Sequence, residues 1–497
     1  AGILIAANSS DWVITRNELS QTPTYRIYTA ANVHYGINIS SGSGYLIQFN
    51  NIGNAGMLGN PVDLPGFPFS YSPGTGVPIR YIGIFGSFSG ITNSIISSNS
   101  IEDIKMFTSS GQAGSSGILC GINVESGKTS ISNNYIGTIF GGTYVATTTS
   151  GGAVVGIRVN SSEGVKISGN QIGGFFASGT ANNIAAGFTG ISLTGSAIDT
   201  VDFNRIGSYF DPITCGYAIG SGGLLSSAVE LLSATSGLAS MTAIECVSTG
   251  NKLVLKDNVF SNWTTSGTAI TVNGIASSGN MTGANASVEV LSNNFNELFP
   301  DLPAFWIKYF VASTAALSGI KVLNTGASVH KITQNEFANP ISYNSISPNS
   351  GVIDFISLSG ATNAGNITTI SQNIFRGKYP SFGTDTFRLK TTNAINFIST
   401  NYDLASTAQR IITSNSCSGL INDGGTVSGD INIIHSTGAS AAGGQVTVSS
   451  NSFRNISASV APGFTISGYW DEDGGLPVNG YPVKTITGNS FRDWVCG

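Results

Sequence analysis

Apolar and polar residues alternate along most of this chain, and the alternation leads into one short phrase that occurs thirteen times. The phrase is an aliphatic residue, two further residues, an asparagine, any residue, and then Ile, Leu, Phe or once Cys. Alternation with a period of two is typical of a β-strand with one buried face. Each phrase therefore predicts a short strand, a bend at the asparagine, and a core residue two positions later.

The asparagines of successive phrases are 33 to 54 residues apart. Self-similarity at such a period is the sequence signature of a solenoid, in which each repeat forms one coil. The thirteen positions are Asn17, Asn50, Asn99, Asn134, Asn170, Asn204, Asn258, Asn293, Asn335, Asn373, Asn415, Asn451 and Asn489.

A second apolar strand precedes most phrases, as at residues 117–124 and 153–159. One such repeat is too short to bury its own apolar face, so the coils are expected to stack with equivalent strands paired in parallel at about 4.8 Å. Equivalent side chains would then form columns. We expect each asparagine to bond turn backbone groups and the asparagine of the next coil, beside a column of Ile, Leu and Phe.

These phrases resemble the asparagine-ladder repeats of the right-handed parallel β-helix superfamily, to which pectate-lyase-like solenoids belong. The resemblance covers nearly the whole chain. It implies an all-β fold, a right-handed parallel β-helix of about thirteen coils with inserted rim loops, formed by residues 1–497 as a single solenoid. The superfamily includes lyases, hydrolases, phage tailspikes and adhesins, so it does not by itself assign a function.

The amino-acid composition limits the kinds of partner and the location that are expected. Only 9% of the residues are charged, the net charge is −5, and there is no Lys/Arg run, so nucleic acid is not an expected partner. No apolar stretch is long enough to span a membrane. The polar residues are mainly Ser, Thr and Asn, and we expect the protein at the cell surface or outside the cell. No polar capping segment is apparent at either end, which favours a segment of a longer chain, with flanking domains or end-to-end self-assembly.

The five cysteines have no metal-site spacing. Cys120, Cys215 and Cys417 occupy positions that other repeats fill with core residues, and we interpret them as small hydrophobes in stacked columns. No metal and no cofactor are expected.

Two loops carry candidate ligand-binding side chains. Residues 299–310 contain the densest aromatic cluster, with Trp306 and Tyr309, and a third, proline-rich excursion is expected at residues 61–81. Aromatic faces flanked by carboxylates suit a sugar-binding groove. The alternative is that these aromatic residues hold their own loops against the solenoid.

The second loop, residues 468–482, contains Trp470 and an acidic run that includes Asp471 and Asp473. Clustered carboxylates are what Ca²⁺ prefers, but no distal bidentate Glu completes a calcium loop. A solvated turn is the alternative interpretation of the acidic run.

Arg376, Arg454 and Arg492 each follow the core residue of their phrase. An arginine row could bind the carboxylate or sulfate groups of an anionic glycan, and Arg454 and Arg492 are the two expected on neighbouring coils. The alternative is a solvated face on which Asp493 neutralises Arg492.

No catalytic residues are predicted, because the paired carboxylate and histidine phrases of β-helical glycosidases and lyases do not occur. The sequence therefore favours a non-enzymatic structural or adhesive surface protein, such as a stalk, an adhesin or a filament subunit, that takes a glycan or a cell-surface ligand. The alternative is a polysaccharide lyase or hydrolase, or a tailspike-like glycan-binding protein.

Overall fold

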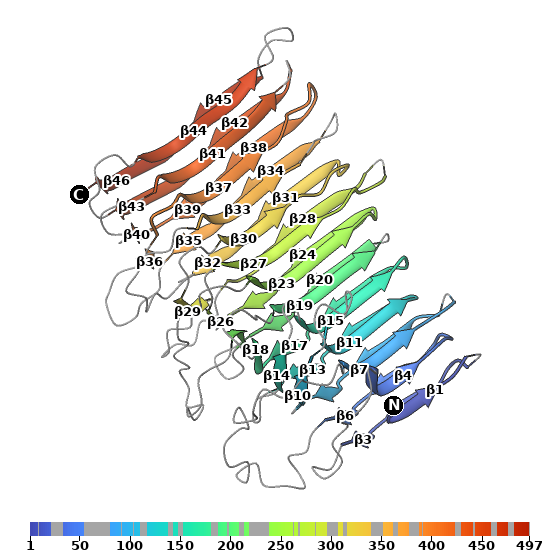
Figure 1. Cartoon of the computed structure of the whole chain (residues 1–497). Coiled ribbons are helices and arrows are strands. Elements are labelled where there is room, and N and C mark those ends of the chain that lie inside the picture. The colour runs from blue at the N-terminus through green and yellow to red at the C-terminus, as the bar shows by residue number, and fades with distance from the viewer. Residues whose placement is uncertain are drawn as a thin grey trace. The chain divides into compact units, whose positions relative to one another are not determined.

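The computed structural model shows a parallel β-helix, as the repeated phrases predict (Figure 1). Its described strands form parallel sheets of thirteen, thirteen, seven, seven and six strands. The structure describes all residues except 8, 21–32, 54–79, 91, 103, 110–116, 138–142, 148–152, 180–186, 196–197, 208–212, 218–237, 262, 267–268, 284, 296–306, 312–315, 339–350, 361–365, 377–386, 390, 423–428, 441–442, 459–464, 476–481 and 497.

The chain divides into two compact units. Unit 1 contains residues 1–194, 204–243 and 263–271, and unit 2 contains residues 195–203, 244–262 and 272–497. In both units the coils contribute strands to three sheets, which we call A, B and C in the order of the chain. A fourth sheet, D, is formed by strands of the connecting segments.

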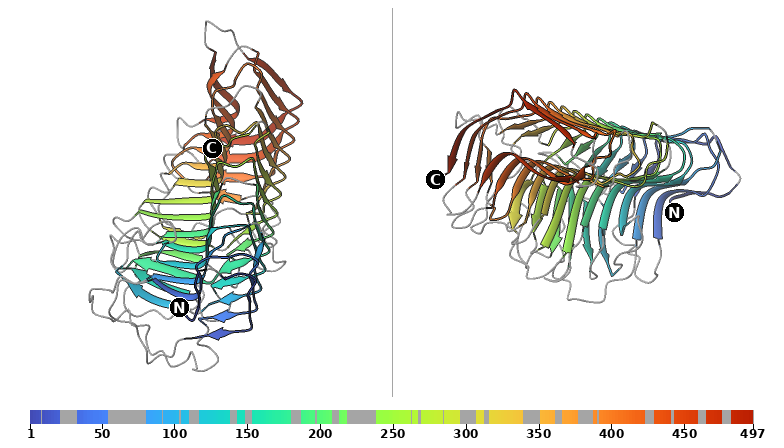
Figure 2. Two further views of the ribbon diagram at one scale, coloured as in Figure 1. Left: turned by 90° about the vertical axis from the view of Figure 1, so that its right-hand side faces the viewer. Right: turned by 90° about the horizontal axis from the view of Figure 1, so that it is seen from above.

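In unit 1 the strands of one sheet lie side by side in chain order (Figure 2). Sheet A contains β1 (Ile3–Ile5), β4 (Val33–Ile39), β7 (Arg80–Ser87), β11 (Leu119–Ser126), β15 (Ala153–Ser161) and β19 (Gly187–Gly195). Sheet B contains β2 (Val13–Thr15), β5 (Leu46–Gln48), β8 (Ser94–Ser97), β12 (Thr129–Ser132) and β16 (Val165–Ser168). Sheet C contains β3 (Glu18–Leu19), β6 (Asn51–Ile52), β9 (Ser100–Ile101), β13 (Tyr135–Gly137), β17 (Gln171–Gly173) and β21 (Arg205–Ile206). Sheet D contains β10 (Lys105–Thr108), β14 (Thr143–Thr147), β18 (Phe175–Gly179), β22 (Ile213–Tyr217) and β26 (Trp263–Ser266).

Unit 2 repeats the same three-sheet coil. Its strands in sheet A are β30 (Ala316–Val322), β33 (Ile353–Ser359), β37 (Ile395–Asn401), β41 (Ile431–Ser440) and β44 (Ile466–Gly475). Sheet B contains β20 (Ile198–Asp202), β24 (Lys252–Lys256), β28 (Ser287–Leu291), β31 (Val329–Thr333), β34 (Ile367–Ser371), β38 (Gln409–Thr413), β42 (Gln445–Ser449) and β45 (Val483–Thr487). Sheet C contains β25 (Val259–Phe260), β32 (Glu336–Ala338), β35 (Ile374–Arg376), β36 (Phe387–Leu389), β39 (Ser416–Cys417), β40 (Leu420–Asn422), β43 (Ser452–Ala458) and β46 (Ser490–Cys496). β29 (Ile307–Val311) belongs to sheet D. β23 (Leu238–Ser248), β27 (Ala269–Ser278) and the last residue of β19, Gly195, extend across both units or into unit 2.

The asparagine ladder is confirmed in both units. The backbone N–H and the side-chain amide of Asn99 both donate to Oδ1 of Asn134, at 3.0 Å each, and Asn134 donates in the same way to Asn170. The side-chain amide of Asn134 also donates to the backbone oxygen of Ile96 in the preceding coil. The pattern runs from Asn17 to Asn204 in unit 1 and from Asn258 to Asn489 in unit 2. Because eleven of the thirteen ladder side chains are buried, the ladder satisfies polar groups that would otherwise be left unpaired.

The backbone conformation at the bend could not be predicted from the repeated phrases. The residue immediately before each ladder asparagine has a positive φ, between 53° and 67°, in all thirteen repeats. Eleven of these residues are not glycine, among them Phe49 and Gln372. The left-handed conformation costs a residue other than glycine about 1–2 kcal/mol. The ladder bonds on the next residue therefore hold a bend that local preference opposes.

Candidate functional site

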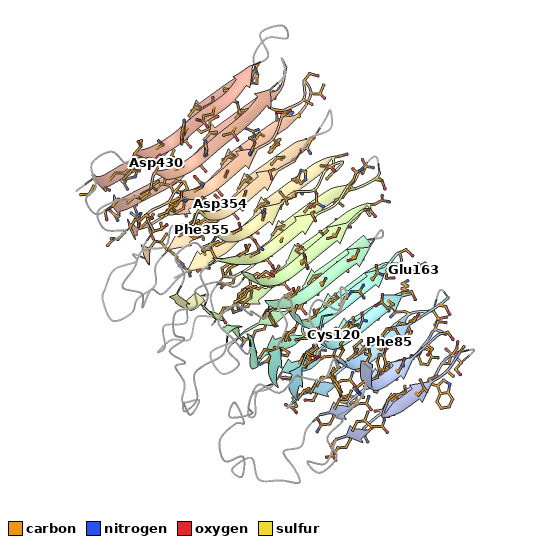
Figure 3. The ribbon with its side chains drawn as sticks, viewed as in Figure 1. Phe85, Cys120, Glu163, Asp354, Phe355 and Asp430 are labelled. Atoms are coloured by element: carbon orange, nitrogen blue, oxygen red, sulfur yellow. The ribbon has the colours of Figure 1, made fainter. Side chains whose placement is uncertain are left out.

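Sheet A of unit 2 carries polar side chains on its outer face, turned away from the core. Asp354, Asn396 and Asn432 are in register on β33, β37 and β41, and each precedes an apolar residue that faces the core. The amide of Asn432 donates to Oδ1 of Asn396 at 2.9 Å, and the amide of Asn396 donates to Oδ1 of Asp354 at 2.7 Å. Figure 3 labels Asp354 beside the core residue Phe355.

These three side chains form a second, outer ladder that is itself largely buried. Asn396 is 8% exposed and Asn432 is 2% exposed. Burial raises the pKa of Asp354, although the bond from Asn396 and the charges of Lys321 and His435 act in the opposite direction. The outer ladder therefore links β33, β37 and β41 on the face that also carries the neighbouring, more exposed side chains.

Beside the outer ladder, two aromatic rings stack on adjacent strands. His435 of β41 and Trp470 of β44 are in register, with ring centroids 4.5 Å apart and planes within 14° of parallel. Nε2 of His435 lies 3.0 Å from a carboxylate oxygen of Glu472. Trp470 is 37% exposed, and the side chain of Glu472 is 47% exposed. We call His435, Trp470 and Glu472 the aromatic platform, because they present a ring and a carboxylate together at the surface.

The two acidic residues predicted next to Trp470 differ in position. Asp471 is exposed and pairs with Lys484 of β45. Asp473 has a fully buried side chain that pairs with the fully buried Arg410 at 2.8 Å. Burial raises the pKa of Asp473, and the positive charges of Arg410 and Lys484 partly offset that effect. Asp471 and Asp473 therefore project from the face of β44 opposite Trp470 and Glu472, and only the Asp473 carboxylate is fully buried.

The segment 468–482 was expected as a loop, and that expectation is wrong for its first part. β44 extends to Gly475 and pairs with β41 along the register from Ile431↔Ile466 to Ser440↔Gly475. Strand pairing overrides the turn-forming Asp and Gly residues here, because each of them has a backbone partner in β41. The platform therefore stands on a sheet and not on a loop.

The other predicted ligand-binding residues lie elsewhere. Arg454 and Arg492 are directly opposite each other on β43 and β46 of sheet C, and both are exposed. Trp306 lies outside the described residues. Tyr309 belongs to β29, but its side chain is not described. Most of the proline-rich excursion at residues 61–81 also lies outside the described part of the chain.

Sequence reasoning missed His435. It stands alone in the sequence, without any neighbouring titratable residue to mark it. The signal that could have found it is the repeat itself, because His435 and Trp470 both directly follow a residue of the same column, Ile434 and Tyr469. Aligning the repeats along sheet A would have placed the two rings on adjacent strands.

A cavity of about 10 Å³ is lined by Val322, Asn324, His330, Leu358, Ser359, Gly360 and Tyr402, which is room for one water and not for a sugar ring. Within the described ranges, no three His, Cys, Asp or Glu side chains come together as a metal site.

No helix in the described part of the chain is long and apolar enough to cross a membrane. Comparisons of the whole chain with protein-family models, with curated proteins and with solved structures give no match.

Proposed function

We propose that this protein is a non-enzymatic, adhesive β-helical module that acts outside the cell and holds a glycan against the aromatic platform. The observation that carries the proposal is the exposed ring of Trp470, stacked on His435 and flanked by the carboxylate of Glu472. A cell-surface location is supported by the low content of charged residues and by the Ser, Thr and Asn side chains of the strands.

The platform offers the two interactions that a sugar ring needs. The apolar face of a pyranose can cover the exposed ring of Trp470, while Glu472 accepts hydrogen bonds from hydroxyl groups at the edge of the sugar. His435 supports the indole ring from the opposite side. Since all three residues stand on paired strands, little side-chain or loop ordering is required on binding.

The charges around the platform favour a neutral glycan. Glu472 is exposed, and the neighbouring Asp471 is already paired with Lys484. An anionic sugar stacked on Trp470 would be brought close to the carboxylate of Glu472 and repelled by it. A neutral ligand avoids that repulsion.

The spacing of carboxylates on this face supports binding without hydrolysis. Asp354 and Glu472 are on strands three steps apart in sheet A, which separates the strand axes by about 14 Å. Asp354 is in register with Ser467, five residues before Glu472, which adds about 16 Å along the strand. Glycoside hydrolysis needs two carboxyl groups about 5–9.5 Å apart. These two residues are therefore too far apart to act as a catalytic pair.

The test is retention of the purified protein on a panel of immobilised neutral polysaccharides, with release of new sugar ends measured in the same wells. Wild-type protein is expected to be retained on at least one polysaccharide, and Trp470→Ala to weaken that binding about tenfold. Trp12→Ala is the matched control, because Trp12 is another exposed tryptophan, in unit 1, at 53% exposure. Equal loss in both variants, or no retention of the wild type, would contradict the proposal, and new sugar ends would favour an enzyme.

A further inference from the structure

Three arginines of sheet C in unit 2 share one column but have different surroundings. Arg376, Arg454 and Arg492 each follow a residue of a single core column, which runs from Phe375 through Cys417 and Phe453 to Phe491. Arg454 and Arg492 are on adjacent strands, so their Cα atoms are about 4.8 Å apart.

Arg376 is neutralised within the protein. Its Nε lies 2.7 Å from Oε1 of Glu336, and its Nη2 contacts the same oxygen. Glu336 comes from β32, the strand next to β35, where it stands opposite Ile374. Each arginine of the column could in principle be neutralised by the equivalent position of the strand before it.

At those equivalent positions, the strands that precede Arg454 and Arg492 carry serine. The column of Glu336 and Ile374 continues as Ser416, Ser452 and Ser490. Arg454 therefore has Ser416 on the preceding strand, and Arg492 has Ser452. A hydroxyl replaces the carboxylate in both cases, which removes the counter-charge and leaves a hydrogen-bond donor.

The carboxylate of Asp493, which lies near the pair, interacts only weakly with Arg492. Nε of Arg492 lies 3.8 Å from a carboxylate oxygen of Asp493, and both side chains are more than three-fifths exposed. An exposed pair at that distance contributes little. Among the described residues, Arg454 has no ion-pair partner, and like charges directly opposite each other in a sheet are unfavourable.

We propose that Arg454 and Arg492, with the hydroxyl of Ser452 beside them on β43, bind an oxyanion carried by an acidic polysaccharide, a sulfate or a carboxylate group. Two guanidinium groups at strand spacing can each donate a pair of parallel hydrogen bonds to oxygens of the anion. Binding converts an unfavourable pair of like charges into a site with two cations and one anion. The site is on sheet C and does not depend on the platform of sheet A.

The experiment is chromatography at low salt on immobilised dextran sulfate, with unmodified dextran as the uncharged matrix. The protein has a net charge of −5, so general attraction to a polyanion is not expected and retention would report a local site. We expect retention of the wild type on dextran sulfate, and about tenfold weaker binding for Arg454→Gln combined with Arg492→Gln. Arg376→Gln is the matched control from the same column and is expected to bind like the wild type.

Thermal unfolding of all variants separates loss of binding from loss of fold. Competition by free inorganic sulfate at concentrations similar to those of the polymer-bound groups would support the site and assign it to the oxyanion alone. Weaker competition would support a polymeric ligand. The proposal is overturned if the wild type is not retained, or if Arg376→Gln loses as much binding as the double variant. Neither result depends on Trp470, so the platform and this site can fail separately.

Discussion

The cores of the two units are built on the same coil but filled differently. In unit 1 the residue two positions after the ladder asparagine is isoleucine in five successive coils, including Ile136. In unit 2 the same position is mostly phenylalanine, and the rings stack from coil to coil. Phe337 lies 4.3 Å from Phe295 and 5.1 Å from Phe375, centroid to centroid, with planes within 16° and 7° of parallel.

Both the isoleucine column and the phenylalanine column depend on the residue of sheet A that packs against them. A Cβ on Gly121 would lie 2.4 Å from Cγ2 of Ile136, and a Cβ on Gly319 would lie 2.4 Å from the ring of Phe337. Two coils of unit 2 place Phe355 and Phe397 at the position that Gly319 occupies in the preceding coil, and these rings pack edge-on against Phe375. The asparagine ladder therefore determines the path of the backbone in each coil. The core column beside it can change from aliphatic to aromatic residues without changing the fold.

The outer face of sheet A differs between the units as well. In unit 1 Ile82, Cys120 and Val155 form a buried apolar cluster with Tyr35 and Phe85 packed against it, and Figure 3 labels Phe85 and Cys120. Burial raises the pKa of the Cys120 thiol to about 12, which keeps it a neutral core residue. The equivalent column of unit 2 is the outer ladder that starts at Asp354. One sheet thus provides an apolar face in one unit and a polar face beside the platform in the other.

The largest expected effect is the loss of one stacked ring. Phe337→Ala should destabilise the protein by about 3–5 kcal/mol, because it leaves a cavity. It also removes ring contacts to Phe295, Phe355 and Phe375. Ile136→Ala in unit 1 should cost about 1–2 kcal/mol less, since no aromatic pairs are lost. Denaturant unfolding of the two variants measures the difference, and equal costs would show that the ring stack adds nothing to the unit 2 core.

The ladder should behave alike in both units, with a smaller effect. Asn293→Ala and Asn134→Ala should each cost about 1–3 kcal/mol, because each leaves backbone groups and the neighbouring asparagine unpaired in a buried site. The same unfolding experiment applies. A large cost in one unit and none in the other would mean that the ladder is not the shared element of the two cores.

The smallest effect should come from the bend. Gln372→Gly in unit 2 should stabilise the protein by about 0.5–1 kcal/mol, since relief of the left-handed strain exceeds the backbone entropy that glycine loses on folding. Gly169→Ala at the equivalent bend of unit 1 should destabilise it, because φ there is +67°. The shift of the melting temperature measures both changes. A Gln372→Gly variant that melts lower than the wild type would show that the bend is not strained.

The sequence was sufficient for the fold because the ladder and the column beside it use the same residue types in every coil. It was not sufficient for the bend, where residues as different as Phe49 and Gln372 adopt one conformation that the next asparagine imposes. The partner of Asp473 was equally hidden, because Arg410 is 63 residues away along the chain and meets it only inside the coil. To predict the aromatic platform, the register between β41 and β44 would have to be known. The spacing of the repeated phrases leaves that register uncertain by several residues.

The most direct test of the proposed function is a crystal structure of the protein with an oligosaccharide cut from the polysaccharide that retains it. We expect a sugar ring stacked on Trp470, with one of its hydroxyl groups within hydrogen-bond distance of Glu472. A sugar bound elsewhere on the molecule, with Trp470 uncovered, would contradict the assignment of the platform as the binding site.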